Sequence, residues 1–363
     1  MKVACPCRTM QLGAADELVG DGTGTLCCRV VPTSPLISVI VAAHDPQGGL
    51  EGCLQSVLGQ SFKDLEVVVV ADESPDCHPA VVDGLARTDG RVSLVRLDGI
   101  VGIGRVRNAG ADRATGRYLL FLDTDHILWD GTLQAMADRL RTCDEPDLLL
   151  LGHTRLHKGR AWPGAAADLL AGLDSRPFDP ADRPELLGAP AYVWDRLIRR
   201  DFWSTHALSF PDGLHEEVPV VHRALLAADR VAALKWDCVQ IRRRHTQHPA
   251  GSPGATQFDV FDRYEESFGL LGEHARPDAA PFLFTRMVRH HLFLLGLSGC
   301  LARSERPTFF RRASAHYQRF VPEGYERPQG REGVKFQLVA NGVYGAFQSA
   351  RIPQLARGVL SRP

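Results

Sequence analysis

The sequence has little net charge and no long hydrophobic run. Its 363 residues carry a formal net charge of -1, so no overall field attracts a nucleic acid or a membrane surface. The most apolar stretch, residues 292–301, is too short to span a bilayer. The first 26 residues contain Asp16, Glu17 and Asp21 and lack the apolar core of a signal peptide. We therefore expect a cytoplasmic protein that has no nucleic-acid partner and that recognises any charged ligand through a local binding site.

The sequence also lacks cysteines at the spacings typical of metal clusters. Its nine cysteines are scattered, and no common two-plus-two zinc arrangement fits Cys5, Cys7, Cys27 and Cys28. We interpret the N-terminal stretch that holds these four as a loose segment. Cysteines within apolar patterns, such as Cys53 and Cys300, are expected to be buried free thiols.

What the first part of the chain does contain is an alternation of short apolar runs and amphipathic stretches. Runs rich in β-branched residues predict buried strands, at 36–43, 65–70, 92–97 and 117–122. Apolar residues at helical spacing predict helices between them, at 50–58, 79–87 and 105–115. This alternation indicates an α/β fold with a mostly parallel sheet, preceded by an N-terminal extension over residues 1–35.

Acidic residues follow several of the predicted strands. In a parallel sheet the carboxyl ends of the strands share one edge, so Asp45, Asp72 and Asp76 should meet Asp123 and Asp125 there. Carboxylate oxygens suit Mg²⁺ or Mn²⁺, and such a cation usually takes its other ligands from water and a phosphorylated substrate. The motif Asp-Thr-Asp also occurs in ordinary turns and helix caps, so this pattern by itself leaves both interpretations open.

An ordered series of motifs resembles the glycosyltransferases of family 2. The series covers residues 36–257 and is more specific than any single motif in it. It consists of Ser38-Val39-Ile40-Val41, Leu54 to Ser61, Glu66 to Val70, Gly104 to Gly110, Ala114 to Asp125, Val193 to Arg200, Phe210 to Glu217, and Arg242 to Gln257. The similarity is strongest to bacterial enzymes that glycosylate cell-wall polymers such as teichoic acids. The resemblance implies a GT-A fold, in which helices flank a Rossmann-like sheet.

The resemblance also implies a binding site for a nucleoside diphosphate sugar. In family 2 the acid after the second strand holds the nucleotide base, and Asp72 matches it, while Ala71 replaces a second aspartate that is usual there. Asp123 and Asp125 match the metal-binding D-x-D motif, and His126 stands where many relatives have a third aspartate. The residues implied for donor binding are Ala43, His44, Asp45, Asp72, Arg107, Asn108, Asp123, Thr124, Arg244, His248 and Ser252.

An acidic pair, Glu216-Glu217, matches the residues that supply the catalytic base in the family. The register favours Glu217 as the base, with Glu216 as the alternative, where relatives commonly have Glu-Asp. Transfer to a hydroxyl needs such a base, and the departing diphosphate needs positive charge from a cation or an arginine. The structural alternative is that both acids only favour a helix N-terminus.

Two further groups of residues are expected around the substrates. Trp194 and Asp195 match the acceptor side, as a stacking surface and a hydrogen-bond acceptor, although core packing explains a tryptophan equally well. A segment suited to closing over the diphosphate contains Arg244, His245, His248 and Ser252. Its two histidines are alternatively metal ligands or solvated loop residues.

From residue 258 to 363 the family motifs stop and the pattern becomes helical. Val260, Phe261 and Phe268 mark one amphipathic helix, and further apolar faces begin near Phe282 and Phe309. We predict a helical C-terminal region that packs on the catalytic domain, binds the acceptor or forms a homo-oligomer. A contact with an anionic polymer or a membrane surface also stays open, because this end contains Arg311, Arg312, Arg319, Arg327 and Arg331.

Together these inferences predict a metal-dependent, inverting glycosyltransferase with Mn²⁺ or Mg²⁺ as its cofactor. The expected donor is a UDP-sugar, and the expected acceptor is a hydroxyl of a cell-surface glycopolymer or of a specialised metabolite. Two other classes are kept: a sugar nucleotidyltransferase, and a catalytically inactive module that only binds a nucleotide sugar. A nucleotidyltransferase usually has a glycine-rich, lysine-containing first loop, which is absent from residues 36–49.

Overall fold

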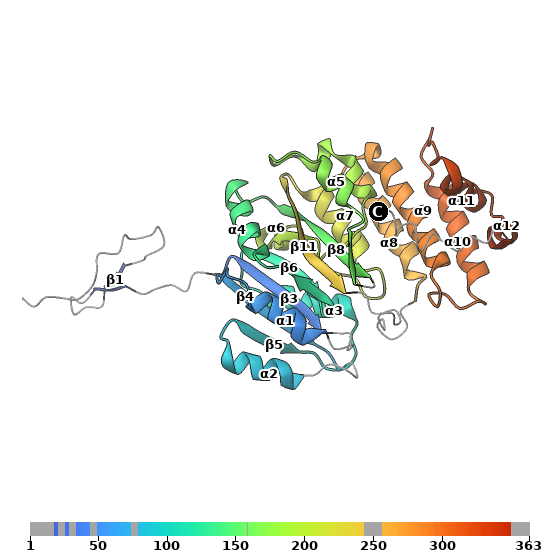
Figure 1. Cartoon of the computed structure of the whole chain (residues 1–363). Coiled ribbons are helices and arrows are strands. Elements are labelled where there is room, and N and C mark those ends of the chain that lie inside the picture. Colours follow the sequence, from blue (N-terminus) through green and yellow to red (C-terminus); the bar gives the residue numbers. More distant parts are fainter. Residues whose placement is uncertain are drawn as a thin grey trace, which may run out of the picture.

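The computed structural model describes residues 34–43, 49–73, 79–157, 159–242 and 256–349, together with two short paired strands, β1 (Leu18–Gly20) and β2 (Leu26–Cys28). Cys5 and Cys7 lie outside the described residues. The predicted elements of the first half are present (Figure 1), with ends within two residues of those expected. They are β3 (Ile37–Ala43), α1 (Leu50–Leu58), β4 (Leu65–Ala71), α2 (Pro79–Thr88), β5 (Val92–Arg96), α3 (Ile103–Arg113) and β6 (Tyr118–Asp123).

The four predicted strands form part of one nine-stranded sheet. The order of its strands is β5-β4-β3-β6-β10-β8-β11-β7, and β9 pairs with β8. The later strands are β7 (His126–Leu128), β8 (Leu148–His157), β9 (Arg160–Pro163), β10 (Arg196–Arg199) and β11 (Val231–Arg242). β3 pairs in parallel with β4 and β6, β4 with β5, and β8 with β11, whereas β7, β9 and β10 run antiparallel to their neighbours. The predicted α/β fold with a mostly parallel sheet is confirmed.

Helices cover both faces of the sheet, because side chains along a strand point alternately to its two sides. In β3, Val39 and Val41 join an apolar cluster with α1 and α4 (Thr132–Thr142), whereas Ile40 joins a second cluster with α3 and α6 (Arg200–Thr205). Gly110 lets α3 approach closely, since an added Cβ would lie 2.3 Å from Ile40 Cγ2. Cys53 and Cys300 are buried free thiols, as predicted.

Parallel pairing brings the carboxyl ends of β3, β4 and β6 to one edge of the sheet. In the observed register Ala43 lies opposite Ala71, which precedes Asp72, and Ala42 lies opposite Asp123. The backbones of Asp72 and Asp123 therefore end up at the same edge, as the strand pattern predicts. Asp45 and Asp76, predicted to join them, lie outside the described residues.

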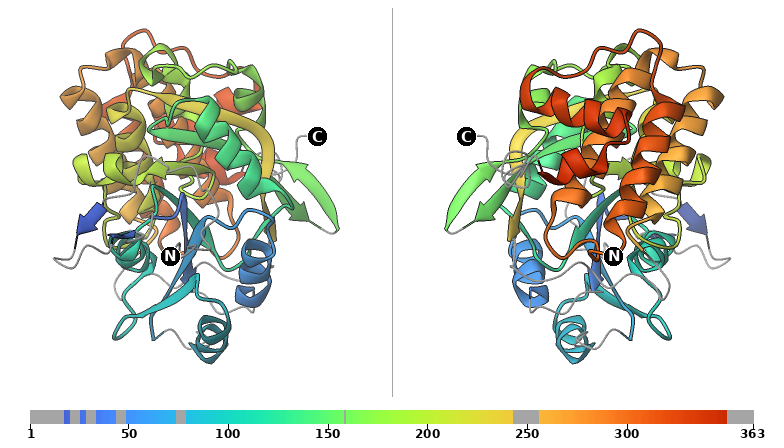
Figure 2. Two further views of the ribbon diagram at one scale, coloured as in Figure 1. Left: turned by 90° about the vertical axis from the view of Figure 1, so that its left-hand side faces the viewer. Right: turned by 90° about the vertical axis from the view of Figure 1, so that its right-hand side faces the viewer.

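The C-terminal region is helical, as predicted. Its helices are α8 (Asp259–Glu273), α9 (Ala280–Gly296), α10 (Arg306–Phe320), α11 (Gly330–Ala340) and α12 (Tyr344–Ser349). Phe261, Phe284 and Phe309 are fully buried in the same apolar cluster as Ile40 of β3. α8 packs on α7 (Glu217–Ala227), and Figure 2 shows the orange and red helices against the green and yellow part of the molecule, opposite its cyan end. This region therefore shares a core with the sheet, and a domain boundary at residue 257 stays a prediction.

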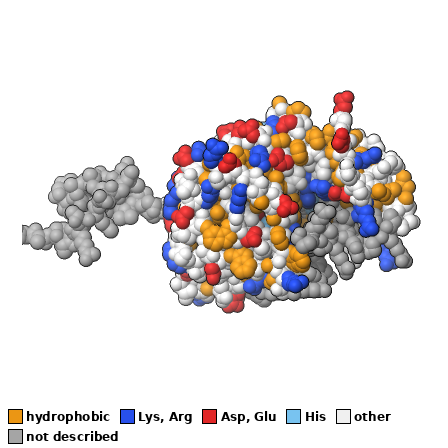
Figure 3. Space-filling view, turned by 45° about the horizontal axis from the view of Figure 1, so that its top comes forward, with side chains coloured by type: hydrophobic (Ala, Val, Ile, Leu, Met, Phe, Trp, Pro, Cys, Tyr) orange, Lys and Arg blue, Asp and Glu red, His pale blue; other side chains and the backbone are white. Residues whose placement is uncertain are grey.

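The surface carries charges of both signs. On the face shown in Figure 3, acidic and basic side chains are interspersed. Two of the C-terminal arginines are paired with acids of α8, Arg312 with Asp262 at 2.7 Å and Arg319 with Glu265 at 3.0 Å. Among the helices of the described residues, none combines the length and the apolarity needed to cross a membrane. Peripheral membrane contact and oligomer formation stay predictions.

Candidate active site

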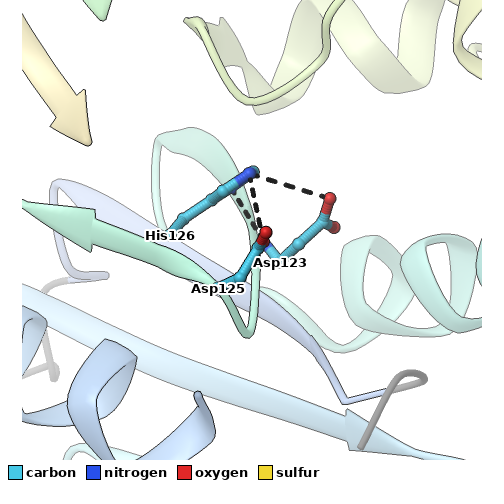
Figure 4. A group of neighbouring side chains, drawn as sticks. All are labelled: Asp123, Asp125 and His126. Atoms are coloured by element: carbon cyan, nitrogen blue, oxygen red, sulfur yellow. Dashed lines mark hydrogen bonds and ion pairs between the residues drawn. The ribbon is translucent and has the colours of Figure 1, made fainter. Parts of the chain in front are cut away.

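The turn between β6 and β7 carries the candidate metal ligands. β6 is apolar and buried up to Leu122, and it is followed by Asp123 at its end and by Thr124 and Asp125 in the turn. One polar atom each from Asp123, Asp125 and His126 lies within 4.8 Å of the other two, and Figure 4 shows these side chains with their polar ends together. The side chains of Asp123 and Asp125 are 28 % and 43 % exposed, so a ligand from solvent can reach both.

His126 faces these acids with its Nε2 atom. Its Nδ1 accepts a hydrogen bond from the backbone N–H of Asp123 at 3.1 Å, so the neutral ring carries its proton on Nε2. Nε2 lies 3.5 Å from Asp125 Oδ1 and 3.9 Å from Asp123 Oδ2. In this tautomer the ring offers no lone pair to a cation at that place. The donor set that fits a cation is the pair of aspartates, whose hard oxygens suit Mn²⁺ or Mg²⁺.

A glycine from another part of the chain fixes the shape of this turn. Gly49 precedes α1, and a Cβ built on it would lie 2.2 Å from the carbonyl oxygen of Thr124. Backbone can approach backbone this closely only where no side chain intervenes. The placement of Asp123 and Asp125 therefore depends on a small residue at position 49.

Arg107 joins the D-x-D motif to the acidic pair. It lies on α3 with a side chain that is only 2 % exposed, and its Nη2 is 2.9 Å from both Asp123 Oδ1 and Glu217 Oε1. Its Nη1 is 2.6 Å from Glu216 Oε1. Burial alone would lower the pKa of Arg107, but the three carboxylates more than offset this and raise it, so the guanidinium stays charged. The structure thus places Arg107 among the acids, and its contact with a donor stays a prediction.

The acidic pair stands at the start of α7. Glu216 is the N-cap and is buried, whereas Glu217 begins the helix with a side chain that is 17 % exposed. Glu217 Oε2 accepts a hydrogen bond from the N–H of Val193 at 3.2 Å. Burial raises the pKa of both carboxyls; Arg107 opposes this, and the charges of Glu216 and Asp123 raise the pKa of Glu217 further. Glu217 is therefore the more accessible acid of the pair, and its raised pKa suits a base.

Ala43 and Asp72, also predicted to bind the donor, lie at the same edge of the sheet. Ala43 ends β3 and is buried, and the buried carboxylate of Asp72 accepts a hydrogen bond from the N–H of Val101 at 3.2 Å. Asn108 ties α3 to the loop before α7, because its amide donates to Phe210 O and accepts from Phe210 N, both at 2.8 Å. The predicted residues that lie outside the described part of the chain are His44, Asp45, Arg244, His245, His248 and Ser252.

Trp194 and Asp195, predicted to face the acceptor, are both buried. The Trp194 ring stacks on Tyr192 and meets the rings of His126 and His153 edge-on. Asp195 pairs with Arg196 at 2.7 Å, and burial raises its pKa. Burial favours the alternative explanation for Trp194, which is core packing behind His126. The burial of Trp194 and Asp195 does not support a contact with an acceptor, and that contact stays a prediction.

Two contributions to the site are not predictable from local sequence patterns. Arg107 and Glu216 are 109 residues apart, and no motif around either of them encodes their ion pair. Gly49 lies in a stretch whose only local signal is the start of a helix. The sequence shows Ala71 in place of one of the family's two aspartates. No local pattern indicates that Gly49 packs on the D-x-D turn.

Part of the chain matches a known protein family. Residues 38–155 match the model of glycosyl transferase family 2, a region that runs from β3 into β8 and includes Asp72, Arg107, Asp123 and Asp125. The acidic pair at the start of α7 and the whole C-terminal region lie beyond the matched residues.

Two bacterial relatives show how far the sequence similarity extends. The chain is 27 % identical over 180 residues to the putative glycosyltransferase EpsH of Bacillus subtilis, covering 49 % of this chain and 51 % of EpsH. It is 35 % identical over 91 residues to the putative teichuronic acid biosynthesis glycosyltransferase TuaG of B. subtilis, covering 25 % of this chain and 36 % of TuaG. The alignments thus span about half of EpsH and about a third of TuaG.

The fold is shared over nearly the whole chain with a solved structure. The crystal structure of S. aureus TarS 1-349 in complex with UDP-GlcNAc matches with a TM-score of 0.67 at 19 % identity. The match covers 88 % of this chain and 93 % of that chain. This similarity confirms the predicted fold.

Proposed function

Residues 38–155 belong to glycosyl transferase family 2, and on this premise we propose that the chain is an inverting glycosyltransferase. It takes a sugar from a nucleoside diphosphate sugar and transfers it to an acceptor hydroxyl. The observation that carries the proposal is the buried cluster in which Arg107 joins Asp123 to Glu216 and Glu217. This cluster joins one acid of the D-x-D motif, Asp123, to the proposed base in one site, as transfer between two bound substrates requires.

The transfer is a single displacement at the anomeric carbon. Glu217 takes the proton of the acceptor hydroxyl while the acceptor oxygen forms its bond to that carbon. The bond from the carbon to the diphosphate oxygen breaks, its electron pair stays on the diphosphate, and the configuration at the carbon inverts. Glu217 can accept the proton while bound to Arg107 and Val193, because a carboxylate has about four lone-pair sites and these contacts use two.

Asp125 and Asp123 are the residues that would hold a divalent cation. Asp125 is the more exposed of the two, and Asp123 shares its Oδ1 with Arg107. When bound, Mn²⁺ or Mg²⁺ supplies positive charge that stabilises the departing diphosphate. The chain's own contribution is to hold both carboxylates at the turn, with His126 Nε2 at 3.5 and 3.9 Å from them and Gly49 against the turn's backbone.

The relatives support a substrate class for this chain. TarS was crystallised with UDP-GlcNAc, and TuaG is named for teichuronic acid biosynthesis. We therefore propose a UDP-sugar as donor and, of the two acceptor classes expected from the sequence, the hydroxyl of a glycopolymer. A cytoplasmic location stays a prediction from the sequence.

The substitution Glu217→Gln tests the proposal. The purified protein is incubated with Mn²⁺ and a panel of UDP-sugars, and release of UDP is measured with water in place of the acceptor. We expect Glu217→Gln to slow release by about 10²–10⁴-fold, because the base is lost. Stabilisation of the protein by UDP and Mn²⁺ in a thermal-shift assay should be kept, because the donor side is unchanged. Glu266→Gln, on the exposed side of α8, is the matched control.

Each other outcome of this experiment has a distinct meaning. Full turnover by Glu217→Gln, or a product that keeps the configuration of the donor, would contradict the mechanism. Binding of UDP without turnover by the wild-type protein, with water and with a glycopolymer acceptor alike, would indicate the inactive binding module. Release of pyrophosphate from a nucleoside triphosphate and a sugar phosphate would indicate the nucleotidyltransferase.

A further inference from the structure

The loop that precedes the acidic pair has an unusual backbone. Gly213 has a φ of +99° and His215 has a φ of +58°. The left-handed region is open to glycine but unfavourable for a residue with a Cβ, such as His215. Residues of this kind persist where surrounding contacts over-determine their conformation, and they gather at functional sites. The conformation of residues 212–216 therefore depends on what packs around it.

Two side chains of α8, one turn apart, hold this loop. Asp259 Oδ2 accepts a hydrogen bond from the N–H of Leu214 at 2.9 Å. Arg263 donates from Nη2 to the carbonyl oxygen of Asp212 and from Nε to that of Leu214 at 3.4 Å. An added Cβ on Gly213 would lie 2.5 Å from Asp259 Oδ2, so the glycine allows the helix to come this close. α8 thus binds the loop through the loop's backbone.

Further contacts join the loop to Gln257, α9 and α3. His215 Nε2 is 2.9 Å from Gln257 Oε1, and its ring meets that of His290 on α9 edge-on, with centroids 4.8 Å apart. Arg105 of α3 forms two hydrogen bonds with the Asp212 carboxylate, at 2.6 and 2.7 Å. The loop is therefore held between α3 of the family region and the C-terminal helices, directly before Glu216 and Glu217.

We propose that Asp259 and Arg263 are positioning residues for Glu217, so that the C-terminal helical region is a working part of the active site. The inference rests on the proposed function. Both residues act through the loop backbone that leads into α7, where Glu216 caps the helix and Glu217 begins it. A displacement of about 1 Å in a catalytic group can cost about a hundred-fold in rate, so a loop held this way has a direct effect on turnover.

Asp259→Ala and Asp262→Ala form a matched pair of variants. Both remove an acid from the first turn of α8, so both lose the same interaction with the helix dipole. Asp259 contacts the loop, whereas Asp262 accepts a hydrogen bond from Arg312 on α10. For both variants we would measure UDP release from UDP-sugars with Mn²⁺ and the amide hydrogen exchange of residues 210–220.

We expect Asp259→Ala to lower kcat about ten- to a hundred-fold with the donor KM within about two-fold of wild type. It should also speed exchange in the loop, whereas Asp262→Ala should change neither quantity. Asp259→Asn keeps an oxygen that can accept from the Leu214 N–H, so it should recover part of kcat.

The proposal is overturned if the two alanine variants have equal kcat and equal exchange. Faster loop exchange with an unchanged kcat would also overturn it, because the order of the loop would then not matter for turnover. An equal fall of kcat in Asp262→Ala would point to a general loss of structure instead. A wild-type protein that releases UDP from no UDP-sugar would contradict the proposed function, and the positioning role would fall with it.

Discussion

Replacing Arg107 by methionine should destabilise the protein, and the loss should grow with pH. The Arg107 side chain is almost fully buried and contacts three carboxylates at 2.6–2.9 Å. Within the part of the chain that the structure describes, no other cation forms an ion pair with Glu216 or Glu217. Methionine keeps an unbranched side chain but leaves these acids without their buried positive charge.

The expected magnitude follows from the cost of breaking a buried ion pair. Removing one partner typically lowers the free energy of unfolding by about 3–5 kcal/mol, because the remaining charge stays buried and uncompensated. Protonation of the acids relieves part of this cost, since burial already raises the pKa of Glu216 and Glu217 and loss of Arg107 raises it further.

The direction of the pH effect follows from proton linkage. Between the ordinary glutamate pKa of about 4.3 and the raised value in the folded protein, the folded state binds more protons than the unfolded state. The free energy of unfolding therefore falls as pH rises through this window, and it falls further in Arg107→Met than in wild type. We expect a smaller difference between the two proteins at pH ~5.5 than at pH ~8.

Urea denaturation followed by circular dichroism at the two pH values measures this difference, provided that the slope of the transition is the same for both proteins. Arg107→Lys should be intermediate, because an ammonium keeps the charge but cannot span three carboxylates as a planar guanidinium does. The control is Arg105→Met on the same helix, whose ion pair with Asp212 is exposed and should matter little for stability.

A loss below about 1 kcal/mol that is equal at both pH values would refute the reasoning, because it would show that the acids do not depend on Arg107. The double variant Arg107→Met, Glu217→Gln gives a second check. If the charges interact as the distances indicate, it should be less destabilised than the sum of the two single changes.

Three further predictions concern the D-x-D turn and the base. Gly49→Ala should push its Cβ against Thr124 O and weaken the affinity for UDP with Mn²⁺ about ten-fold, as measured by calorimetry, because overpacking costs about 1–3 kcal/mol. Gly52→Ala is the control, since its added Cβ would make an ordinary 3.6 Å contact with Ile127 and should leave UDP binding unchanged. Equal affinities of the two variants would contradict the role of Gly49. Asp125→Asn should remove the extra thermal stabilisation of the protein that Mn²⁺ adds to that given by UDP alone. Asp138→Asn, at an exposed position, should keep it. The acid limb of kcat/KM should lie above pH ~4.3, since burial raises the pKa of Glu217 and the base acts deprotonated; a limb at or below that pH would contradict this.

Apolar spacing and the order of the motifs were enough to predict the main elements of the fold and to find the acidic motifs. The strands from β3 to β6 and the helices α1 to α3 could be predicted because apolar spacing within a few residues decides whether a segment becomes a strand or a helix. Asp123 and Asp125 could be assigned to one edge of the sheet because parallel strands end on the same side. The C-terminal helices were predictable from their amphipathic spacing in the same way.

Which side chains meet, and which are removed from water, could not be predicted without the packing of the elements. Arg107 and Glu216 come from helices far apart in the sequence, and Asp259 reaches Leu214 from 45 residues away. Trp194, assigned to the acceptor from its motif, is covered by Tyr192 and two histidines. The physical reason is that packing between distant segments sets burial, and burial sets the strength of an ion pair and the pKa of an acid. A short stretch of sequence contains the groups of this site, but the packing between its helices and its sheet determines their charges and contacts.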